Sequence, residues 1–250
     1  MKIVTWNCNG ALRRKLLAVD ELNADVLVVQ ECEDLARSTE DYRRWAGGYL
    51  WIGESPNRGI GIFPKNGHSV RALDWHGVFR LAGLESQSEA IQWASPDLRL
   101  FLPFSIDDQL TGLAVWTKGG RGEPFGYMGQ FWKYLQIHRD KLAADKTVIL
   151  GDFNSNTCWD QPGRWWNHSD VVAELASLSL RSLYHHQFSE SQGREKTPTF
   201  FMHRRMDRPF HIDYVFVSND LLEQSVLEVG AHEAWVGWSD HVPLSVHLPA

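Results

Sequence analysis

Short apolar runs recur along the chain, and several of them end in a polar side chain. The run "KIVTW" at residues 2–6 is followed by Asn7, and "ADVLVVQE" at residues 24–31 ends in Glu31. Continuous apolar runs of this length are typical of strands that are buried on both faces. We predict further strands in the segments YLWIG, GIGIF, VRALDW, AIQWAS, LRLFLPFSI, LTGLAVWT, HIDYVFVS and PLSVHL.

Other segments repeat apolar side chains every three or four residues, which is the spacing of one helix face. This pattern predicts helices over residues 12–22, 127–144 and 169–180, the last with Ser169 as its N-cap. No linker, internal repeat or low-complexity tract interrupts the sequence. The mixture of β-rich stretches with a few helices predicts an α/β fold, in which two packed sheets carry helices outside. We expect one domain over residues 1–250.

The segment "KTVILGDFNSN" places a carboxylate and an amide directly after an apolar run. If the strand continues, Asp152 and Asn154 share one side and Phe153 takes the other, because side chains alternate along a strand. The two polar side chains would then form the lip of a site. A turn is the alternative, since Gly, Asp and Asn all favour turns.

Polar side chains also stand at or near the ends of other predicted strands. These residues are Asn7, Asn9, Glu31, Asp213, Asp240 and His241. If the strand ends converge, the amide and carboxylate oxygens suit a hard cation such as Mg²⁺. The Asp and His side chains suit proton transfer and stabilisation of a phosphate. The sequence has neither the Cys and His spacing of a zinc site nor a Gly-rich phosphate loop.

Composition narrows the class of protein. A content of 43% hydrophobic and 22% charged residues is ordinary for a globular protein. The net charge of −6 argues against a strongly basic DNA-binding face, although a local basic patch is compatible with it. Three cysteines do not make a disulfide framework, and no apolar run reaches the ~18 residues of a membrane span. We therefore expect a cytoplasmic protein without a membrane span.

A set of ordered motifs extends over nearly the whole chain. The motifs are TWNCNG, VVQE, GIGIF, GDFNS, HIDYVFVS and WSDHVPL. On these motifs the chain resembles the endonuclease/exonuclease/phosphatase family, the metal-dependent phosphodiesterases with the deoxyribonuclease-I-like fold. The resemblance implies a four-layered α/β sandwich, with two packed mixed β-sheets flanked by helices and the site at one edge of the sheets.

The resemblance also implies a metal site. Glu31 would be the main ligand, with Asn7, Asn9 and Asp240 nearby. The implied ion is Mg²⁺, and Mn²⁺ could replace it.

Catalytic roles follow from the same resemblance. Asp152 would orient or deprotonate the attacking water, and Asn154 would help to hold that water or the phosphate. His241 would stabilise the phosphoryl oxygens, and Asp213 would hold the ring of His241 in one tautomer. The implied reaction is in-line attack of water on a phosphoester, with charge neutralised by the metal and by hydrogen-bond donors.

One position departs from the family pattern. Many relatives place His or Tyr at the end of the strand before the long helix, where this chain has Trp116. An indole N–H donates a hydrogen bond but cannot take a proton, so we do not expect this position to protonate a leaving group. Trp116 either shapes the substrate site or belongs to the core. Asn57 and Arg58 either reach a phosphate of the substrate or form a plain turn.

Some loop and cysteine positions leave alternatives open. Trp159, Trp165 and Trp166 follow "GDFNSN" and either stack on bases or cap a core under a long loop. Cys8 and Cys32 each neighbour a candidate site residue. Alternation should turn both cysteines away from the site, so we predict that they are small core residues.

The sequence thus predicts a Mg²⁺-dependent phosphoesterase, with a nuclease as the first choice. The same fold and core residues serve many phosphoesters, so the first alternative is a phosphatase or phosphodiesterase acting on a small nucleotide, a phospholipid headgroup or a sugar phosphate. The second alternative is an inactive phosphate-binding module, which only Trp116 favours. The expected partner is a phosphoester substrate, DNA or RNA in the nuclease case, and no obligate protein partner is evident.

Overall fold

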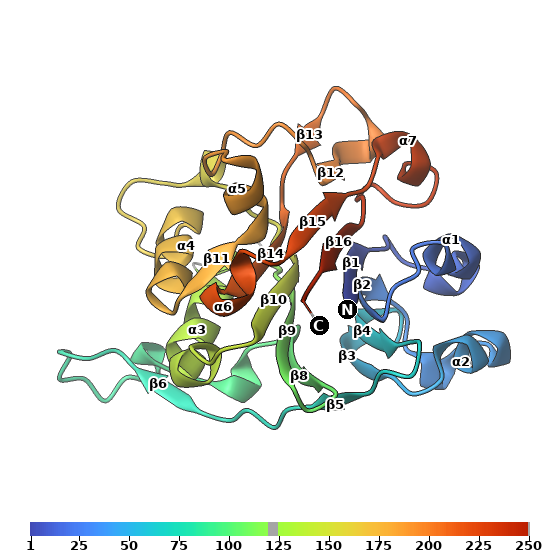
Figure 1. The fold of residues 1–250 in the computed structure, drawn as a ribbon. Coiled ribbons are helices and arrows are strands. Elements are labelled where there is room, and N and C mark those ends of the chain that lie inside the picture. The colour runs from blue at the N-terminus through green and yellow to red at the C-terminus, as the bar shows by residue number, and fades with distance from the viewer. Residues whose placement is uncertain (120–124, 250) are drawn as a thin grey trace.

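Two six-stranded β-sheets face each other, and helices cover their outer sides (Figure 1). The computed structural model describes residues 1–119 and 125–249. The first sheet has the strand order β15-β16-β1-β2-β4-β3. Its strands are β1 (Lys2–Asn7), β2 (Val26–Cys32), β3 (Leu50–Ser55), β4 (Arg58–Pro64), β15 (Val226–Val229) and β16 (Leu244–His247).

The second sheet has the strand order β11-β14-β10-β9-β8-β5. Its strands are β5 (Val70–Ala72), β8 (Phe101–Ile106), β9 (Leu110–Trp116), β10 (Thr147–Asp152), β11 (Leu180–Ser182) and β14 (Asp213–Ser218). Two short hairpins lie outside both sheets, β6 (Val78–Arg80) with β7 (Gln92–Ala94) and β12 (Phe200–Phe201) with β13 (Pro209–Phe210). The helices are α1 (Leu16–Asp20), α2 (Glu40–Ala46), α3 (Met128–Leu142), α4 (His168–Ser177), α5 (Leu183–Phe188), α6 (Asn219–Leu222) and α7 (His232–Trp235).

Both sheets repeat one pattern of strand directions. In each sheet the two central strands run parallel, β1 with β2 and β10 with β9. All other neighbouring strands in the two sheets run antiparallel. Parallel strands end at the same edge of a sheet, so each sheet brings two strand carboxyl ends together. Strands β14 and β16, which run antiparallel to β10 and β1, begin at those same edges.

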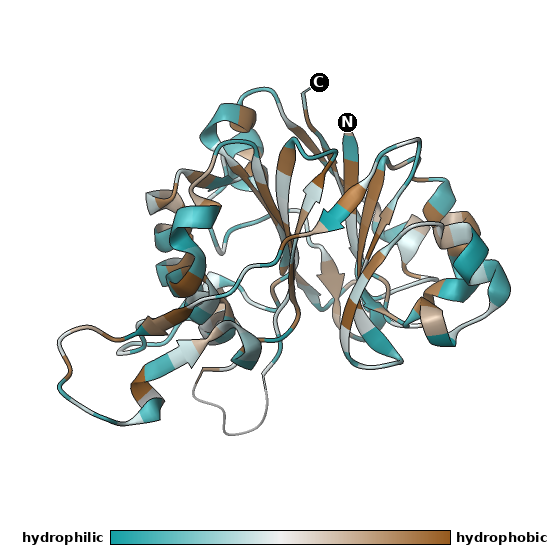
Figure 2. Ribbon diagram, turned by 90° about the horizontal axis from the view of Figure 1, so that it is seen from below, coloured by the Kyte–Doolittle hydropathy of each residue, from teal (hydrophilic) through white to brown (hydrophobic). Residues whose placement is uncertain are grey.

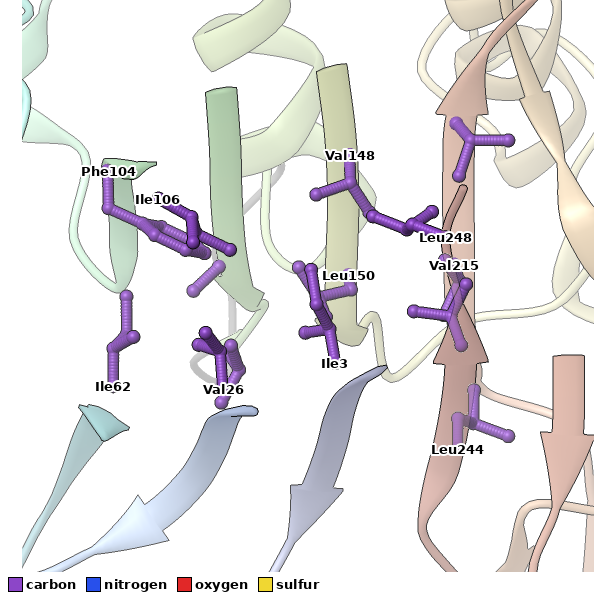
Figure 3. Packing of buried hydrophobic residues seen from close by; sticks show 14 of the residues in the cluster. Ile3, Val26, Ile62, Phe104, Ile106, Val148, Leu150, Val215, Leu244 and Leu248 are labelled. Carbon is purple, nitrogen blue, oxygen red and sulfur yellow. The ribbon is translucent and has the colours of Figure 1, made fainter. Parts of the chain in front are cut away.

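The main apolar core lies between the two sheets. Ile3 and Val26 from the first sheet meet Val148 and Leu150 from the second, and all four side chains are fully buried (Figure 3). A second core packs α3 and α4 against the second sheet, and a third packs α1 and α2 against the first. Apolar residues accordingly concentrate in the strands of the two facing sheets (Figure 2). The predicted four-layered α/β sandwich is confirmed.

Two predicted helix boundaries are wrong. Residues 12–22 form a short 3₁₀ turn and then α1, because Lys15 between them leaves helical geometry, with φ −123° and ψ 8°. Helix α4 has Asn167 rather than Ser169 as its N-cap, and Asp170 in the first turn accepts the Asn167 backbone N–H at 2.8 Å.

The two cysteines next to site residues lie where the sequence predicts. Cys8 and Cys32 are fully buried in the apolar core between the first sheet and its helices.

Within the described residues, no helix combines the length and the apolar character needed to cross a membrane.

Candidate active site

Polar side chains from both sheets meet at the edge where the central strands end. The amide of Asn7, the last residue of β1, donates a 2.8 Å hydrogen bond to Oδ2 of Asp152, the last residue of β10. Asp213 begins β14 and pairs in register with Asp152. All three side chains are almost fully buried. Buried polar groups are costly unless they are paired, so this edge is a specific arrangement and not solvated surface.

A turn, and not strand alternation, brings Asp152 and Asn154 together. Strand β10 ends at Asp152, and Asn154 has a left-handed backbone with φ 45°. The Asn154 backbone N–H donates to Asp152 Oδ1 and its side-chain amide donates to Oδ2, both at 2.8 Å. This is the local bond pattern of an Asx turn. Phe153 is fully buried on the other side, so both interpretations of the sequence contribute: the segment is a turn, and it forms the lip of a polar site.

His241 lies between two carboxylates. Its Nδ1 is 2.9 Å and 3.1 Å from the two carboxylate oxygens of Asp213, and its Nε2 is 4.0 Å from Asp152 Oδ2. The ring of Phe200 packs against the imidazole with a centroid separation of 4.6 Å. The pairing with Asp213 fixes the ring orientation and directs Nε2 toward Asp152.

Burial and charge determine the protonation of this group. Burial raises the pKa of the Asp152 carboxyl to about 7, although the positive charge of His241 opposes the rise. Burial by itself lowers the pKa of His241, but the carboxylates of Asp213 and Asp152 together outweigh it and raise the pKa to about 9. At neutral pH the imidazole is therefore a cation, and Asp152 lies near its own titration point. A carboxylate with a pKa near the working pH is well matched to general-base chemistry.

Glu31 reaches the same edge through an irregularity in β2. The register of β2 with β4 shifts between Gln30 and Cys32, and Glu31 at this bulge has a left-handed backbone with φ 61°. Its Oε1 is 3.4 Å from the Asn7 amide nitrogen, and its Oε2 is 3.2 Å from a guanidinium nitrogen of Arg58. Bulges commonly redirect a side chain next to an active site. Asn7 thus links the carboxylates of Glu31 and Asp152.

The donors around Glu31 fit a hard divalent cation. The Glu31 side chain is 16% exposed, so it is accessible at the rim. The Ser239 hydroxyl donates to the Asn7 backbone carbonyl at 2.8 Å and lies 3.4 Å from Asp240 Oδ1, which ties Asp240 to the same edge. The side-chain carbonyl of Asn7 accepts the Asn9 backbone N–H at 3.0 Å. Carboxylate and amide oxygens are the ligands that Mg²⁺ takes in proteins.

A second group of ligand-type side chains lies deeper. One potential ligand atom each from Asp152, Asp213 and His241 all lie within 4.8 Å of one another. A cationic imidazole has no lone pair to offer a metal, and its Nδ1 already pairs with Asp213. This trio therefore suits proton chemistry better than metal binding.

The three candidate substrate contacts lie in different settings. Trp116 is 3% exposed and belongs to the core between the sheets, and Lys118 lies over its ring at 4.8 Å. Asn57 and Arg58 are exposed at the start of β4. Arg58 reaches the site through Glu31. Trp116 is thus a core residue, and it pairs with Asp152 in the register of β9 and β10.

Thr199 and Ser239 support the site, and no sequence pattern predicts this role. Thr199 Oγ1 accepts the backbone N–H groups of Ile212 and Asp213, both at 3.0 Å, and so fixes the start of β14. Ser239 Oγ accepts the backbone N–H of His241 at 3.0 Å. Both are single hydroxyls in loops, and only the fold shows that they hold this edge of the sheets in place.

Solved structures with this fold include an exonuclease, a 3′ phosphatase and an AP endonuclease. The 3′-5′ exonuclease NExo from Neisseria meningitidis shares 22% identity and a TM-score of 0.69, and both chains are fully covered. The 3′ phosphatase NExo from Neisseria bound to a product DNA hairpin shares 21% identity at the same TM-score and the same coverage. An AP endonuclease from Archaeoglobus fulgidus shares 18% identity and a TM-score of 0.65, again with complete coverage of both chains. These likenesses establish the fold.

The family of the chain follows from its sequence. Comparison with curated protein sequences gives no match. The model of the Endonuclease/Exonuclease/phosphatase family matches residues 4–241, which is nearly the whole chain. Enzymes of this family are metal-dependent. The chain belongs to the endonuclease/exonuclease/phosphatase family and is a hydrolase that acts on phosphoester bonds.

Proposed function

We propose that this protein is a Mg²⁺-dependent nuclease that hydrolyses phosphodiester bonds by in-line attack of water. The observation that carries the proposal is the position of Asp152, buried beneath the rim, 2.8 Å from the Asn7 amide and 4.0 Å from His241. Support for a nucleic-acid substrate comes from the similar folds described as an exonuclease and an AP endonuclease.

In this proposal each side chain has one task. Asp152 takes a proton from water as the water oxygen bonds to phosphorus and the ester P–O bond breaks, and the leaving oxygen takes its proton from solvent. Asn154 holds the water or a phosphoryl oxygen through its amide. The cationic imidazole of His241 donates a hydrogen bond to a phosphoryl oxygen, and Asp213 keeps that imidazole oriented. Trp116 is buried, and its indole N–H donates hydrogen bonds but is too weak an acid to give up its proton, so it does not protonate the leaving oxygen.

Glu31, Asp240 and Asn7 would hold the divalent cation at the rim, next to Asn9. A bound Mg²⁺ would supply positive charge that stabilises the phosphoryl oxygens in the transition state. The guanidinium of Arg58 lies 3.2 Å from the Glu31 carboxylate. A bound cation would therefore compete with Arg58 for Glu31 or displace it.

A small phosphoester is the second candidate substrate. The net charge is −6, and two cations close to the site already have acidic partners, Arg58 with Glu31 and Lys118 with Glu54. A long nucleic acid needs several unpaired cations along its path for strong binding. These charges favour a substrate that contributes one phosphate, such as a nucleotide ester.

A metal-supplemented substrate screen tests the proposal. The wild-type protein is assayed with Mg²⁺ on DNA, RNA, bis(p-nitrophenyl) phosphate and phospholipid headgroup esters, with His241→Ala as the control. We expect hydrolysis of the nucleic acids and of the aryl diester, and loss of both with His241→Ala. Hydrolysis of the headgroup or another small ester without any on DNA or RNA would replace the nuclease by the second candidate.

A further inference from the structure

The loop that follows β1 runs along the metal rim on an unusual backbone. The φ angles of Asn9, Gly10 and Ala11 are all positive, at 51°, 73° and 52°. Glycine adopts such angles freely, asparagine tolerates them, and alanine is strained by them. Strained backbone persists only where surrounding contacts hold it, and it is concentrated at functional sites. The contacts that hold this loop therefore bear on the proposed metal site.

Lys15 holds the start of this loop from the protein interior. Its ammonium group donates a hydrogen bond to the backbone carbonyl of Cys8 and lies 5.7 Å from the ring centroid of Trp6. Lys15 is only 9% exposed, although lysine is almost never buried without a partner. The Cys8 carbonyl belongs to the planar peptide unit that joins Cys8 to Asn9. The hydrogen bond from Lys15 therefore fixes the direction in which the chain enters the left-handed segment.

Glu33 holds the other end of the same loop. Its carboxylate is buried and accepts the backbone N–H groups of Leu12 at 2.8 Å and Arg13 at 3.2 Å. The Arg13 guanidinium also donates to this carboxylate, at 2.7 Å. Hydrogen bonds to a charged group are stronger than those between neutral groups. Lys15 and Glu33 thus fix the two ends of a strained loop with charge-assisted hydrogen bonds.

The position of this loop controls the donors next to it. The side-chain carbonyl of Asn7 accepts the Asn9 backbone N–H at 3.0 Å, so the orientation of the Asn7 amide depends on where the Asn9 backbone lies. The amide nitrogen of Asn7 is in turn 3.4 Å from Glu31 Oε1. Mg²⁺ demands a nearly ideal arrangement of its ligands, so a small displacement of the loop should cost affinity.

The charge of Lys15 has the opposite effect on a metal ion. An ammonium group close to the rim repels a divalent cation, so on charge alone the loss of Lys15 would strengthen metal binding. If its hydrogen bond to the loop is what counts, the same loss would weaken metal binding. The two effects differ in sign, and a binding measurement can therefore separate them.

We propose that Lys15 is a positioning residue for the metal site, because its hydrogen bond to the Cys8 carbonyl sets the loop that orients the Asn7 amide beside Glu31. The proposal rests on the proposed function, from which it takes the divalent cation at the rim. It goes beyond that function by giving a task to a buried lysine that contacts neither the substrate phosphate nor the cation.

Binding of Mn²⁺ to the metal-free protein, followed by the electron paramagnetic resonance signal of the free ion, tests the proposal without hydrolysis. Lys15→Met should weaken Mn²⁺ binding about tenfold or more, the usual effect of removing a group that orients metal ligands. Arg14→Met is the matched control, because it removes the same charge from the adjacent, exposed position, and it should change affinity by less than about twofold. Glu31→Gln removes a proposed ligand and marks the loss expected at this site.

Two binding results would overturn the role of Lys15. Equal Mn²⁺ affinity of the wild type and a folded Lys15→Met protein would mean that the hydrogen bond does not set the site. Tighter binding by Lys15→Met would mean that the charge of Lys15 outweighs its hydrogen bond. Thermal unfolding of each variant checks its folding.

Hydrogen exchange of the wild type tests the loop even if Lys15→Met does not fold. The backbone N–H of Asn9 is bonded to Asn7 Oδ1, so its protection reports the loop directly. If Lys15 sets the loop, Mg²⁺ should change the protection of Asn9 by less than about threefold relative to Val4 in the core of β1. A relative increase of about tenfold or more would mean that the ion, and not Lys15, orders the loop.

Kinetics separate this proposal from the proposed function. On bis(p-nitrophenyl) phosphate, Lys15→Met should need about tenfold more Mg²⁺ for half-maximal rate and should reach a kcat within about twofold of the wild type at saturating Mg²⁺. A lower kcat with an unchanged Mg²⁺ requirement would contradict the positioning role. A wild type that binds Mn²⁺ but hydrolyses no ester would contradict the proposed phosphodiesterase, while the binding data would still decide the role of Lys15. A wild type that binds no Mn²⁺ would overturn both proposals.

Discussion

At the scale of single residues, Asp152 combines deep burial with a charge that the reaction needs. It accepts hydrogen bonds from the Asn7 amide and from both the backbone and the side chain of Asn154, all at 2.8 Å. These donors stabilise the ionised carboxylate, but burial outweighs them and raises the pKa to about 7. The ionised form is therefore held at a cost to folding stability, as is common for catalytic groups.

Replacing Asp152 by Asn should separate activity from stability. The variant loses the proposed base, so turnover of a diester should fall by about a hundredfold or more. The melting temperature should change by no more than about 4 °C. The neutral amide removes the cost of burying a charge, and this gain in stability offsets the loss of one hydrogen-bond acceptor. Steady-state kinetics and calorimetry check the two parts, and near wild-type turnover in a folded Asp152→Asn protein would remove the proposed role.

At the scale of elements, the end of β10 depends on a residue without a side chain. Gly151 has φ 145°, and a Cβ at this position would lie 1.9 Å from the carbonyl oxygen of Val115 on β9. Only glycine allows β9 and β10 to approach this closely just before Asp152. The sheet geometry that presents Asp152 therefore rests on one residue of the "GDFN" motif.

Gly151→Ala should destabilise the fold by about 3 kcal/mol or more, because the methyl group meets backbone that cannot move without breaking the strand pairing. Gly48→Ala is the control, since a Cβ there meets nothing within 4 Å, and its effect should stay within about 0.5 kcal/mol. Urea unfolding measures both variants. If the two variants were equally stable, the close approach of β9 and β10 would not be needed for folding.

The bulge in β2 shows what the sequence can and cannot reveal about an element. The apolar run of residues 24–31 predicts the strand and its polar end, and this is where β2 lies. The left-handed backbone of Glu31 arises from pairing with β4, which no local pattern encodes. Likewise, alternation anticipates that Asp152 and Asn154 lie together, but the actual cause is a turn made by their own hydrogen bonds.

At the scale of the whole molecule, the two sheets were predictable and the outer loops were not. Continuous apolar runs reveal central strands, since both of their faces are buried. The 12–22 segment repeats apolar residues at helical spacing, yet Lys15 breaks it because its ammonium group bonds the Cys8 carbonyl of the neighbouring loop. A cavity of about 540 Å³ lies beside the site, and it depends on contacts between the Trp159 loop and the β12–β13 hairpin, which are distant in sequence.

Buried ionisable groups outside the site should make the molecule less stable in acid. Burial lowers the pKa of His168 to about 4, below the ordinary 6.5, so the unfolded chain binds its proton first as pH falls. Its contribution is complete above pH 6.5, is lost between 6.5 and 4, and is on the order of 3 kcal/mol. The pKa of His241 is shifted in the opposite direction, to about 9, so its contribution to stability is complete below pH 6.5 and is lost as pH rises from 6.5 to 9.

Urea unfolding at pH 7 and pH 5 checks this pH dependence. As pH falls from 7 to 5, the wild type should change in stability less favourably than His168→Gln, because Gln cannot titrate, whereas the raised pKa of Asp152 stabilises both proteins equally over this range. Part of the slope should remain in the variant, since burial also lowers the pKa of His138 to about 4. Equal slopes for the wild type and His168→Gln would contradict the assignment to His168.

The central claim is that oxygen donors at the ends of β1 and β2 and in the loop before β16 gather around one divalent cation at the site edge. Its most direct test is a Mg²⁺ titration of bis(p-nitrophenyl) phosphate hydrolysis after removal of metal with EDTA, for the wild type and for Glu31→Gln. We predict no hydrolysis in EDTA, full recovery with Mg²⁺, and at least a tenfold higher Mg²⁺ requirement for Glu31→Gln, since one charged ligand is lost. Undiminished hydrolysis in excess EDTA would contradict the claim.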